Sequence, residues 1–407
     1  MLSENAIENL ADIIALRQEK LNQYVINLIA KRVNEIGTLK SSDVYKLERL
    51  LKSGDDVKKI NAEISRITGL QIEDIKRIIK QVAKDNYIDA KPYYDYRRKS
   101  YIPFEDNKPL QAVIASIAKQ TIDTYVNLSK AQAFMLRDLK DPSKLIPTPL
   151  SKAYYSVIDE AVQASQQGTI DYSTAMRRTM KQLVDSGIRH VEYNAESGRH
   201  FSQRLDTAVR RNVLDGIRAI NQGVQDITGE QYGADGKEIS VHQFSAPDHE
   251  PVQGRQFTNE EYEKLQNAEP FEDVTGKKYK PFERAIGTLN CRHFTYSIII
   301  GVNKPNFTDA QLEEFATKNN KGYTLPNGKH LTMYECTQKQ REYETKIRRL
   351  KERQMALQAA GDIDGAKEAQ SKINSEIKKY KAFSNKCGLS VKANKMSVTG
   401  YKKISLN

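Results

Sequence analysis

The fold of the C-terminal half is decided by one stretch, Asn290-Cys291-Arg292-His293-Phe294-Thr295-Tyr296-Ser297-Ile298-Ile299-Ile300-Gly301. A short apolar run that ends in glycine predicts a buried strand over residues 294–300. Upstream, residues 239–244 alternate between apolar and polar and predict a second strand. Between the two strands we expect a hydrophilic helix at 259–268 and turns at 270–281. These elements predict a small α/β domain over residues 229–332.

The chain before Gly229 predicts mostly helices. Apolar residues recur at intervals of three and four from Glu4 to Ile36, which is the helical period, and Gly37 closes that helix. Further helices are expected at 42–52, 56–68, 73–87, 109–139, 151–167, 172–185 and 197–227. The pair at 56–68 and 73–87, joined at Gly69, has the outline of a helix-turn-helix. A structural helical hairpin is the alternative reading of the same pair.

Residues 87–109 interleave six aromatic side chains with Arg97, Arg98 and Lys99. Such a pattern can stack nucleic-acid bases and hold phosphates. Alternatively, the tyrosines pack across neighbouring helices or onto a partner protein.

The C-terminal segment predicts a charged helical hairpin. One helix is expected from Thr332 to Ala360 and a second up to Ala382, with a turn at 361–365, so that two apolar faces meet. The tail beyond it has too little apolar content to fold alone. Overall we expect an α+β protein with an elongated, mainly helical domain at 1–228, the α/β domain at 229–332, the hairpin at 333–383 and a basic tail at 384–407.

Positive charge is concentrated at the C-terminus. Residues 338–407 hold 17 lysines and arginines against 7 acidic residues, an excess of 10 out of the net +12 of the whole chain. This asymmetry indicates a phosphate-rich partner, although a solvated lysine-rich helix would show it too. The candidate nucleic-acid-binding residues of the tail are Lys386, Lys392, Lys395, Lys402 and Lys403.

Composition narrows the class of protein further. The chain has 407 residues, 39% hydrophobic and 29% charged, and no tryptophan, which favours two or three units with much exposed surface. Three cysteines make a disulfide scaffold unexpected. The sequence shows neither a signal-peptide pattern nor an apolar run long enough to span a bilayer. We therefore expect synthesis in a reducing cytoplasm.

Four side chains could bind a metal ion: His242, His249, Cys291 and His293. They meet if the strand at 239–244 neighbours the strand at 294–300, and imidazole with thiolate is the ligand set that zinc prefers. A filled site of this kind would be structural zinc, because zinc catalysis needs an open coordination position. The alternative is a small buried cysteine with hydrogen-bonded histidines at strand ends. No other cofactor is expected.

Signals for catalysis are weak. Cys291 with His249 or His242 would be a thiol nucleophile and its base, but Cys291 precedes a strand and has no helix N-terminus to activate it. Phosphate-binding glycine loops are absent from the sequence. Asp235, Asp248 and Glu250 could hold magnesium, but they do not form a paired-carboxylate pattern.

The order of three motifs resembles the phage minor capsid protein 2 family of tailed phages. The first motif runs from His242 to Gly254, the second from Asn290 to His293, and the third from Tyr334 to Arg348. Residues that carry the resemblance, besides the four candidate ligands, are Pro247, Gln253, Gly254, Asn290, Arg292, Gly301, Tyr334, Gln338, Gln340, Arg341 and Arg348.

That family is distantly similar to MuF-type head morphogenesis proteins, which have an early cysteine pair and a late Asn-Cys-Arg-Cys. On this comparison His249 stands at the second early cysteine, and Cys291 and His293 stand at the closing pair. The chain departs from the usual pattern at Ala246, at the place of the first early cysteine, and at Val252 and Leu289, where tryptophans are usual.

The resemblance implies a structural protein of the virion, not an enzyme, made in the host cytoplasm and placed inside the capsid at the portal vertex. Its implied partners are the portal protein, the major capsid protein and packaged double-stranded DNA, with no membrane in the head and no small-molecule substrate. The helical domain at 1–228 would dock on portal or capsid. The alternatives are a virion-carried enzyme or toxin-like effector that uses residues 239–328, and a host DNA-binding regulator that uses the helix pair at 56–87.

Overall fold

The computed structural model describes residues 4–38, 43, 54–138, 141, 143–167, 172–193, 200–267, 269–272, 276, 278–279, 285–287, 291 and 293–406. These residues form two compact units, each built from three separate stretches of chain. Unit 1 comprises Met1–Asp12, Ile72–Thr124 and Arg211–Gln338, and unit 2 comprises Ile13–Gln71, Tyr125–Arg210 and Lys339–Asn407. The assignment of docking and tail roles to the ranges 1–228, 229–332, 333–383 and 384–407 stays a prediction.

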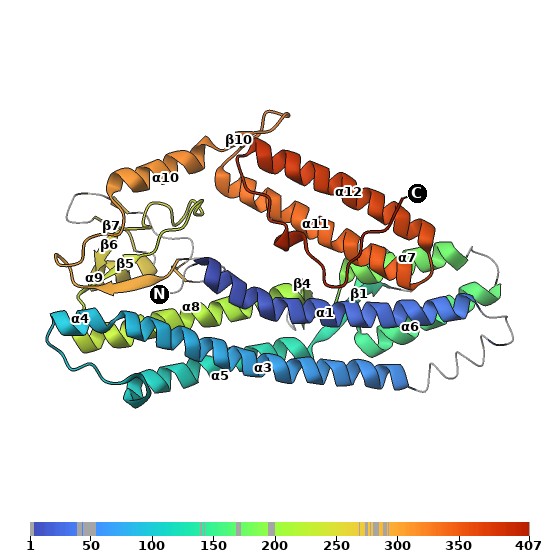
Figure 1. Cartoon of the computed structure of the whole chain (residues 1–407), viewed down its shortest axis with the longest axis horizontal. Coiled ribbons are helices and arrows are strands. Elements are labelled where there is room, and N and C mark those ends of the chain that lie inside the picture. The colour runs from blue at the N-terminus through green and yellow to red at the C-terminus, as the bar shows by residue number, and fades with distance from the viewer. Residues whose placement is uncertain are drawn as a thin grey trace. The chain divides into compact units, whose positions relative to one another are not determined.

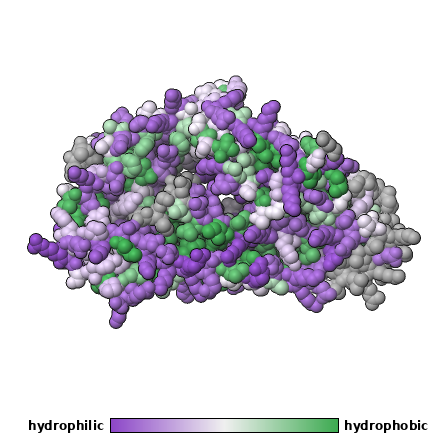
Figure 2. All heavy atoms as spheres, in the orientation of Figure 1, coloured by the Kyte–Doolittle hydropathy of each residue, from purple (hydrophilic) through white to green (hydrophobic). Residues whose placement is uncertain are grey.

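The described chain is mainly helical with small antiparallel sheets (Figure 1). As predicted, α1 spans Glu4–Gly37, α6 spans Leu150–Gln167, α7 spans Tyr172–Ser186 and α9 spans Asn259–Gln266. The predicted helix at 42–52 lies outside the described residues, apart from Asp43. Among the described helices, none is long and apolar enough to cross a membrane. Figure 2 shows a face on which hydrophilic residues predominate and hydrophobic residues form smaller groups.

Both readings of the pair at 56–68 and 73–87, as a helix-turn-helix and as a structural helical hairpin, are wrong, because α3 runs without a break from Asp55 to Asp89. Apolar residues keep one helical period through Gly69: Ile60 and Ile67 before it and Ile75, Ile78 and Val82 after it are all buried. Glycine inside a helix costs only roughly 0.5–1 kcal/mol, which the buried face of so long a helix offsets. The reading as a host DNA-binding regulator loses its structural basis.

Unit 2 contains a four-stranded antiparallel sheet that the sequence did not predict. The strands are β1 (Gln132–Arg137), β2 (Leu145–Pro149), β3 (Arg189–Tyr193) and β4 (His200–Arg204), in the order β2-β1-β3-β4. The helix predicted at 109–139 therefore ends early, since α5 spans Lys108–Lys130. The helix predicted at 197–227 begins late, since α8 spans Leu205–Tyr232. Pro147 and Pro149 lie on β2 at the sheet edge, where a missing backbone N–H is tolerated.

The predicted C-terminal hairpin also belongs to unit 2, apart from its first residues. It consists of α11 (Met333–Ala359) and α12 (Ile363–Lys386), which run side by side in Figure 1. Gly361 turns the chain with φ +78°, and the Asp362 side chain accepts a hydrogen bond from the Gly365 backbone N–H. Ile347 and Tyr380 form a buried core with Met396 of the tail. The tail, which includes η2 (Asn394–Met396), thus packs against the apolar face of the hairpin.

Unit 1 holds the small α/β region. Its sheet has the order β6-β5-β9, with β5 at Gly236–Ile239, β6 at Gln256–Thr258 and β9 at Thr295–Ile298. The strand predicted at 294–300 exists as the shorter β9. The strand predicted at 239–244 is wrong beyond Ile239, because β5 lies earlier in the chain and residues 240–244 belong to the loop that follows it. Further elements of the unit are α4 (Lys91–Tyr96), η1 (Phe104–Asp106), β7 (Phe271–Glu272), β8 (Lys278–Tyr279), α10 (Asp309–Lys321), β10 (Tyr323–Thr324) and β11 (His330–Leu331).

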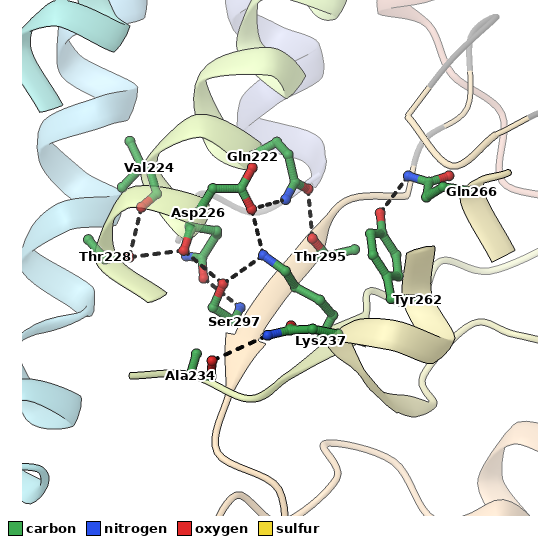
Figure 3. A network of polar contacts seen from close by, with 12 residues as sticks. Gln222, Val224, Asp226, Thr228, Ala234, Lys237, Tyr262, Gln266, Thr295 and Ser297 are labelled. Carbon is green, nitrogen blue, oxygen red and sulfur yellow. Dashed lines mark hydrogen bonds and ion pairs between the residues drawn. The ribbon is translucent and has the colours of Figure 1, made fainter. Parts of the chain in front are cut away.

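The end of α8 anchors this sheet through polar side chains (Figure 3). Lys237 Nζ lies 2.5 Å from Asp226 Oδ1 and 3.0 Å from Ser297 Oγ. Thr295 Oγ1 donates to Gln222 Oε1 over 2.6 Å. Because these contacts hold β5 and β9 against one helix, the segment that enters β9 has a fixed position.

Four tyrosines of residues 87–109 pack inside unit 1, as one of the two sequence readings expected, whereas Tyr96 is exposed. The rings of Tyr87 and Tyr101 stack at a centroid distance of 4.9 Å, and those of Tyr93 and Tyr232 stack at 5.3 Å. Tyr87 and Tyr94 are buried. Burial, together with the nearby Tyr87, raises the pKa of Tyr101 to about 12. These rings form part of the core and are not a platform for bases.

Candidate functional site

Pairing of β5 with β9 brings the two histidine-containing motifs together. Ile239 lies opposite Thr295 in the ladder. One residue further along, the Ser240 N–H donates to the Phe294 carbonyl over 2.8 Å, and the Phe294 N–H donates to Ser240 Oγ over 3.1 Å. The loop that follows β5 therefore starts beside the residues that precede β9.

That loop, residues 240–255, folds back through tight turns. The His249 N–H donates to the Ala246 carbonyl over 3.1 Å, and the Gln253 N–H donates to the His249 carbonyl over 3.2 Å. Gly254 then rejoins the strand, where its N–H donates to the Ile239 carbonyl over 2.8 Å. These turns direct His249 and Gln253 toward Cys291 and His293.

Three of the four candidate ligands converge on one buried point. Cys291 Sγ lies 3.2 Å from His249 Nδ1 and 3.5 Å from His293 Nδ1. The three ligand atoms all lie within 4.8 Å of one another. The exposed fractions of the residues are 0% for His249 and 1% each for Cys291 and His293. We call these three residues the His-Cys-His cluster.

The outer nitrogens of both imidazoles face oxygen atoms. His293 Nε2 lies 3.3 Å from Gln253 Oε1 and 3.4 Å from Ser245 Oγ. His249 Nε2 lies 3.5 Å from Asp248 Oδ2. Each ring is thus oriented by a neighbour on its far side, with its Nδ1 toward the sulfur.

His242 flanks the cluster and does not join it. Its ring is partly buried and lies against His293 at a centroid distance of 4.3 Å. The His242 N–H is 3.3 Å from Gln253 Oε1, and His242 Nδ1 is 3.3 Å from the Gln243 carbonyl. Its imidazole nitrogens are not among the atoms that share the 4.8 Å cluster.

The environment of Cys291 favours the thiolate. Burial raises the pKa of the thiol, but the contact with His249 and a hydrogen bond from the Gly287 backbone together lower it more, and the net pKa is below that of an ordinary thiol. A thiolate is the form in which cysteine binds metals or acts as a nucleophile. Cys336 and Cys387 are buried thiols as well, and neither belongs to a disulfide.

Two of the remaining motif residues, Gln340 and Tyr334, make structural hydrogen bonds. Gln340 is buried and donates to Ser384 Oγ and to the Ser390 carbonyl, both at 3.0 Å, which ties α11 to α12 and the tail. The Tyr334 N–H donates to Asn319 Oδ1 over 2.9 Å. Pro247, Gly301 and Arg341 are exposed, and Gln338 is partly buried. Asn290 and Arg292 lie outside the described residues.

The candidate DNA-binding lysines lie on the surface of unit 2. Lys386, Lys392, Lys402 and Lys403 are exposed, and Lys395 is partly buried. The backbone between them is held by the hairpin, since the Lys392 N–H donates to the Tyr380 hydroxyl over 2.9 Å and the Ile404 N–H to Gln370 Oε1 over 3.2 Å. The positively charged side chains of the tail therefore extend from a backbone with a fixed position.

Sequence reasoning missed a cavity of about 190 Å³ in unit 2. Four arginines line it, together with two acidic residues: Arg189, Arg204, Arg348, Arg349, Asp206 and Glu352. Arg204 Nη2 pairs with Glu352 at 3.0 Å and with Asp206 at 3.3 Å. The residues come from distant parts of the chain, and only Arg348 belonged to a recognised motif, so the sequence carried no signal for the cavity.

Comparison with known proteins identifies the chain at the level of the family. No curated protein and no solved structure matches it. The family model described as phage minor capsid protein 2 matches residues 3–385, a range that takes in most of both units, the His-Cys-His cluster and nearly all of the hairpin. The chain therefore belongs to the phage minor capsid protein 2 family and is a structural protein of a bacteriophage particle.

Proposed function

We propose that this protein works inside the phage head at the portal vertex, in head morphogenesis, and that it acts by binding portal protein, major capsid protein and packaged DNA. Membership of a minor capsid family is the observation that carries the proposal. The ordered basic hairpin and tail support the contact with DNA. The helices of residues 1–228 are the proposed docking element for portal or capsid.

The DNA contact predicts a strong dependence on salt. Each phosphate that the protein neutralises releases counterions and adds about 0.9 to the steepness of log K against log salt concentration. The test is to change Lys386, Lys392, Lys402 and Lys403 together to Gln and to measure binding to double-stranded DNA over a salt series. We expect weaker binding and a shallower slope.

Substitution is preferable to truncation here, because removal of the tail would also expose the hairpin core around Met396. The matched control changes four exposed lysines of unit 1 to Gln: Lys91, Lys99, Lys304 and Lys329. Equal weakening in both variants would mean that net charge alone attracts DNA. An unchanged slope in the tail variant would remove the proposed contact.

The partners can be tested by chemical cross-linking of intact particles followed by mass spectrometry. We expect cross-links from residues 1–228 to the portal or the major capsid protein. Cross-links to tail proteins alone would contradict the proposed position.

A second candidate function is a virion-carried thiol hydrolase or effector. The 3.2 Å contact between Cys291 and His249, with the lowered pKa of the thiol, favours it. An electrophilic thiol probe applied to the native protein should then label Cys291 before Cys336 and Cys387. If all three label only after unfolding, the burial of Cys291 reflects a structural role.

A further inference from the structure

We propose that the His-Cys-His cluster is a structural zinc site, in which His249 Nδ1, Cys291 Sγ and His293 Nδ1 bind the ion. The inference stands apart from the proposed contacts with portal and DNA, because it rests on the geometry of this cluster alone. The first step is to decide which imidazole nitrogens carry protons.

Gln253 fixes the tautomer of His293. Gln253 Oε1 lies 3.3 Å from the His242 backbone N–H, which can only donate, so this side-chain atom is the amide oxygen and not the nitrogen. The same oxygen lies 3.3 Å from His293 Nε2. A neutral imidazole satisfies that oxygen only if Nε2 carries the proton, which leaves a lone pair on Nδ1.

The position of the proton on the His249 ring is inferred in the same way, from the group next to Nε2. Its Nε2 lies 3.5 Å from the Asp248 carboxylate, whose negative charge favours a proton on Nε2 and so a lone pair on Nδ1. Two nitrogen lone pairs therefore point at one sulfur atom. A thiol has a single proton and can satisfy only one of them, whereas a divalent cation accepts both nitrogens and the thiolate.

The two sulfur-to-nitrogen distances agree with tetrahedral zinc. Bonds of about 2.3 Å to sulfur and about 2.0–2.1 Å to nitrogen, at a tetrahedral angle, separate sulfur from nitrogen by about 3.5 Å. The observed separations from Cys291 Sγ are 3.2 Å to His249 and 3.5 Å to His293. The two Nδ1 atoms lie within 4.8 Å of each other, and around a bound ion they would settle about 3.3 Å apart.

Both imidazoles have an oxygen atom next to the ring nitrogen that would not bind the metal. Imidazole ligands usually donate their other N–H to a carboxylate or a carbonyl oxygen, which orients the ring. Gln253 takes this role for His293, and the Asp248 carboxylate faces the Nε2 of His249 at 3.5 Å. The Asp248 carboxylate also balances the single positive charge that remains when a thiolate binds a divalent ion.

A structural zinc site has four protein ligands, and His242 is the side chain placed to supply the fourth. Its partly buried ring lies 4.3 Å, between centroids, from that of His293. Coordination requires this ring to turn toward the sulfur when the ion binds. The closed site would join the loop 240–255 to the segment that enters β9, and its binding energy would stabilise the folded α/β region.

The test uses the full chain, purified without chelator, and measures zinc by elemental analysis. We expect one zinc per chain, a thiolate-to-metal charge-transfer band after replacement by Co²⁺, and a lower Tm after the metal is removed by a chelator. These measurements need no variant, so they do not depend on whether a variant folds.

Variants then locate the ion. Cys291→Ser and His293→Ala should lose zinc, while the matched controls Cys336→Ser and His330→Ala, at residues of unit 1 outside the cluster, should keep it. Gln253→Ala removes only the outer contact and should weaken zinc binding by about 10–100-fold at unchanged stoichiometry. Zinc affinity should also fall in His242→Ala, and an unchanged affinity there would overturn the four-ligand site.

Absence of zinc from the wild type, together with failure to take up added Zn²⁺ or Co²⁺, would overturn the proposal. So would zinc that persists in both Cys291→Ser and His293→Ala, since the ion would then be adventitious or bound elsewhere.

Discussion

Gly254 shows how one backbone position shapes the candidate site. Its φ is +71°, and a Cβ there would lie 2.6 Å from Leu312 Cδ2 and 2.7 Å from Val241 Cγ2. Both the backbone conformation and the lack of space therefore require glycine, which lets the loop return to the sheet immediately after Gln253. Gly301 has a similar φ of +75°, but a Cβ there meets no described atom within 4 Å.

These two glycines form a matched pair for a stability test. Gly301→Ala should cost about 1–2 kcal/mol, since only backbone strain is added. Gly254→Ala should cost a further 1–3 kcal/mol or so, because Leu312 and Val241 must also move. Urea denaturation of both variants checks this expectation, and equal destabilisation would show that the close packing around Gly254 is unimportant.

Glu19 of α1 makes stability depend on pH. Burial, and next the negative charge of Glu352, raise the pKa of Glu19 to about 7, while Arg348 opposes the shift. Its Oε1 has no hydrogen-bond partner among the described residues. The neutral carboxyl is therefore favoured in the folded protein, which binds a proton more tightly than the unfolded chain does. This contribution to stability is complete below pH 4.5 and disappears as the pH rises through about 7.

Glu19→Gln mimics the neutral carboxyl and should remove this dependence. We expect the variant to resemble the wild type near pH 5 and to be more stable at pH 8, by an amount on the order of 2 kcal/mol. Thermal unfolding between pH 5 and pH 8 measures the difference. Glu313→Gln, at an exposed residue of α10, is the control. A constant difference across this pH range would contradict the assignment.

At the residue scale the sequence predicted that His249, Cys291 and His293 come together, but not how their side chains are oriented. His249, Cys291 and His293 stood out because imidazole and thiol flank predicted strands. The outlying position of His242, and the role of Gln253 between His242 and His293, depend on turns whose geometry no local pattern specifies.

At the scale of elements, α3 offers the sharpest test of the fold. Gly69 is exposed within the continuous helix, and a Cβ there would meet no described atom within 4 Å. Gly69→Ala should therefore raise the free energy of unfolding by roughly 0.5–1 kcal/mol, through helix propensity and reduced freedom of the unfolded chain. Chemical denaturation measures this gain. A decrease in stability would instead indicate that the chain turns at Gly69.

Long amphipathic helices such as α1 and α6 were predictable because their period extends over many residues. The strand β1 was not, since its buried stretch of Ala133-Phe134-Met135-Leu136 is short and continues the apolar content of α5. Periodicity cannot distinguish such a run from the end of a helix. The sequence alone did not reveal that this run pairs with β2 and β3, and that pairing is what makes it a strand.

At the scale of the whole molecule, the C-terminal tail carries exposed positive charge and also packs against the hairpin. The tail has too little apolar content for its own core, but Met396 and Val398 are buried. Lys351 supports it, because its Nζ donates to the Met396 carbonyl over 2.8 Å and lies 4.8 Å from the centroid of the Tyr401 ring. The basic surface is thus part of a folded unit.

The family was predictable from the sequence because three motifs occur in a fixed order. The composition of the two packing units was not, because each unit draws on three separate stretches of chain. The cavity around Arg204 illustrates the difficulty: it joins residues 189–207 to residues 345–352, and that proximity arises only from the fold of unit 2.

The central claim, a minor head protein placed at the portal vertex, is tested most directly by electron cryo-microscopy of intact particles, reconstructed around that vertex without imposed symmetry. We predict density inside the head, next to the portal, into which the separate folds of unit 1 and unit 2 can be fitted. Density for these folds only on the outer surface of the particle, or particles that lack the chain altogether, would contradict the account.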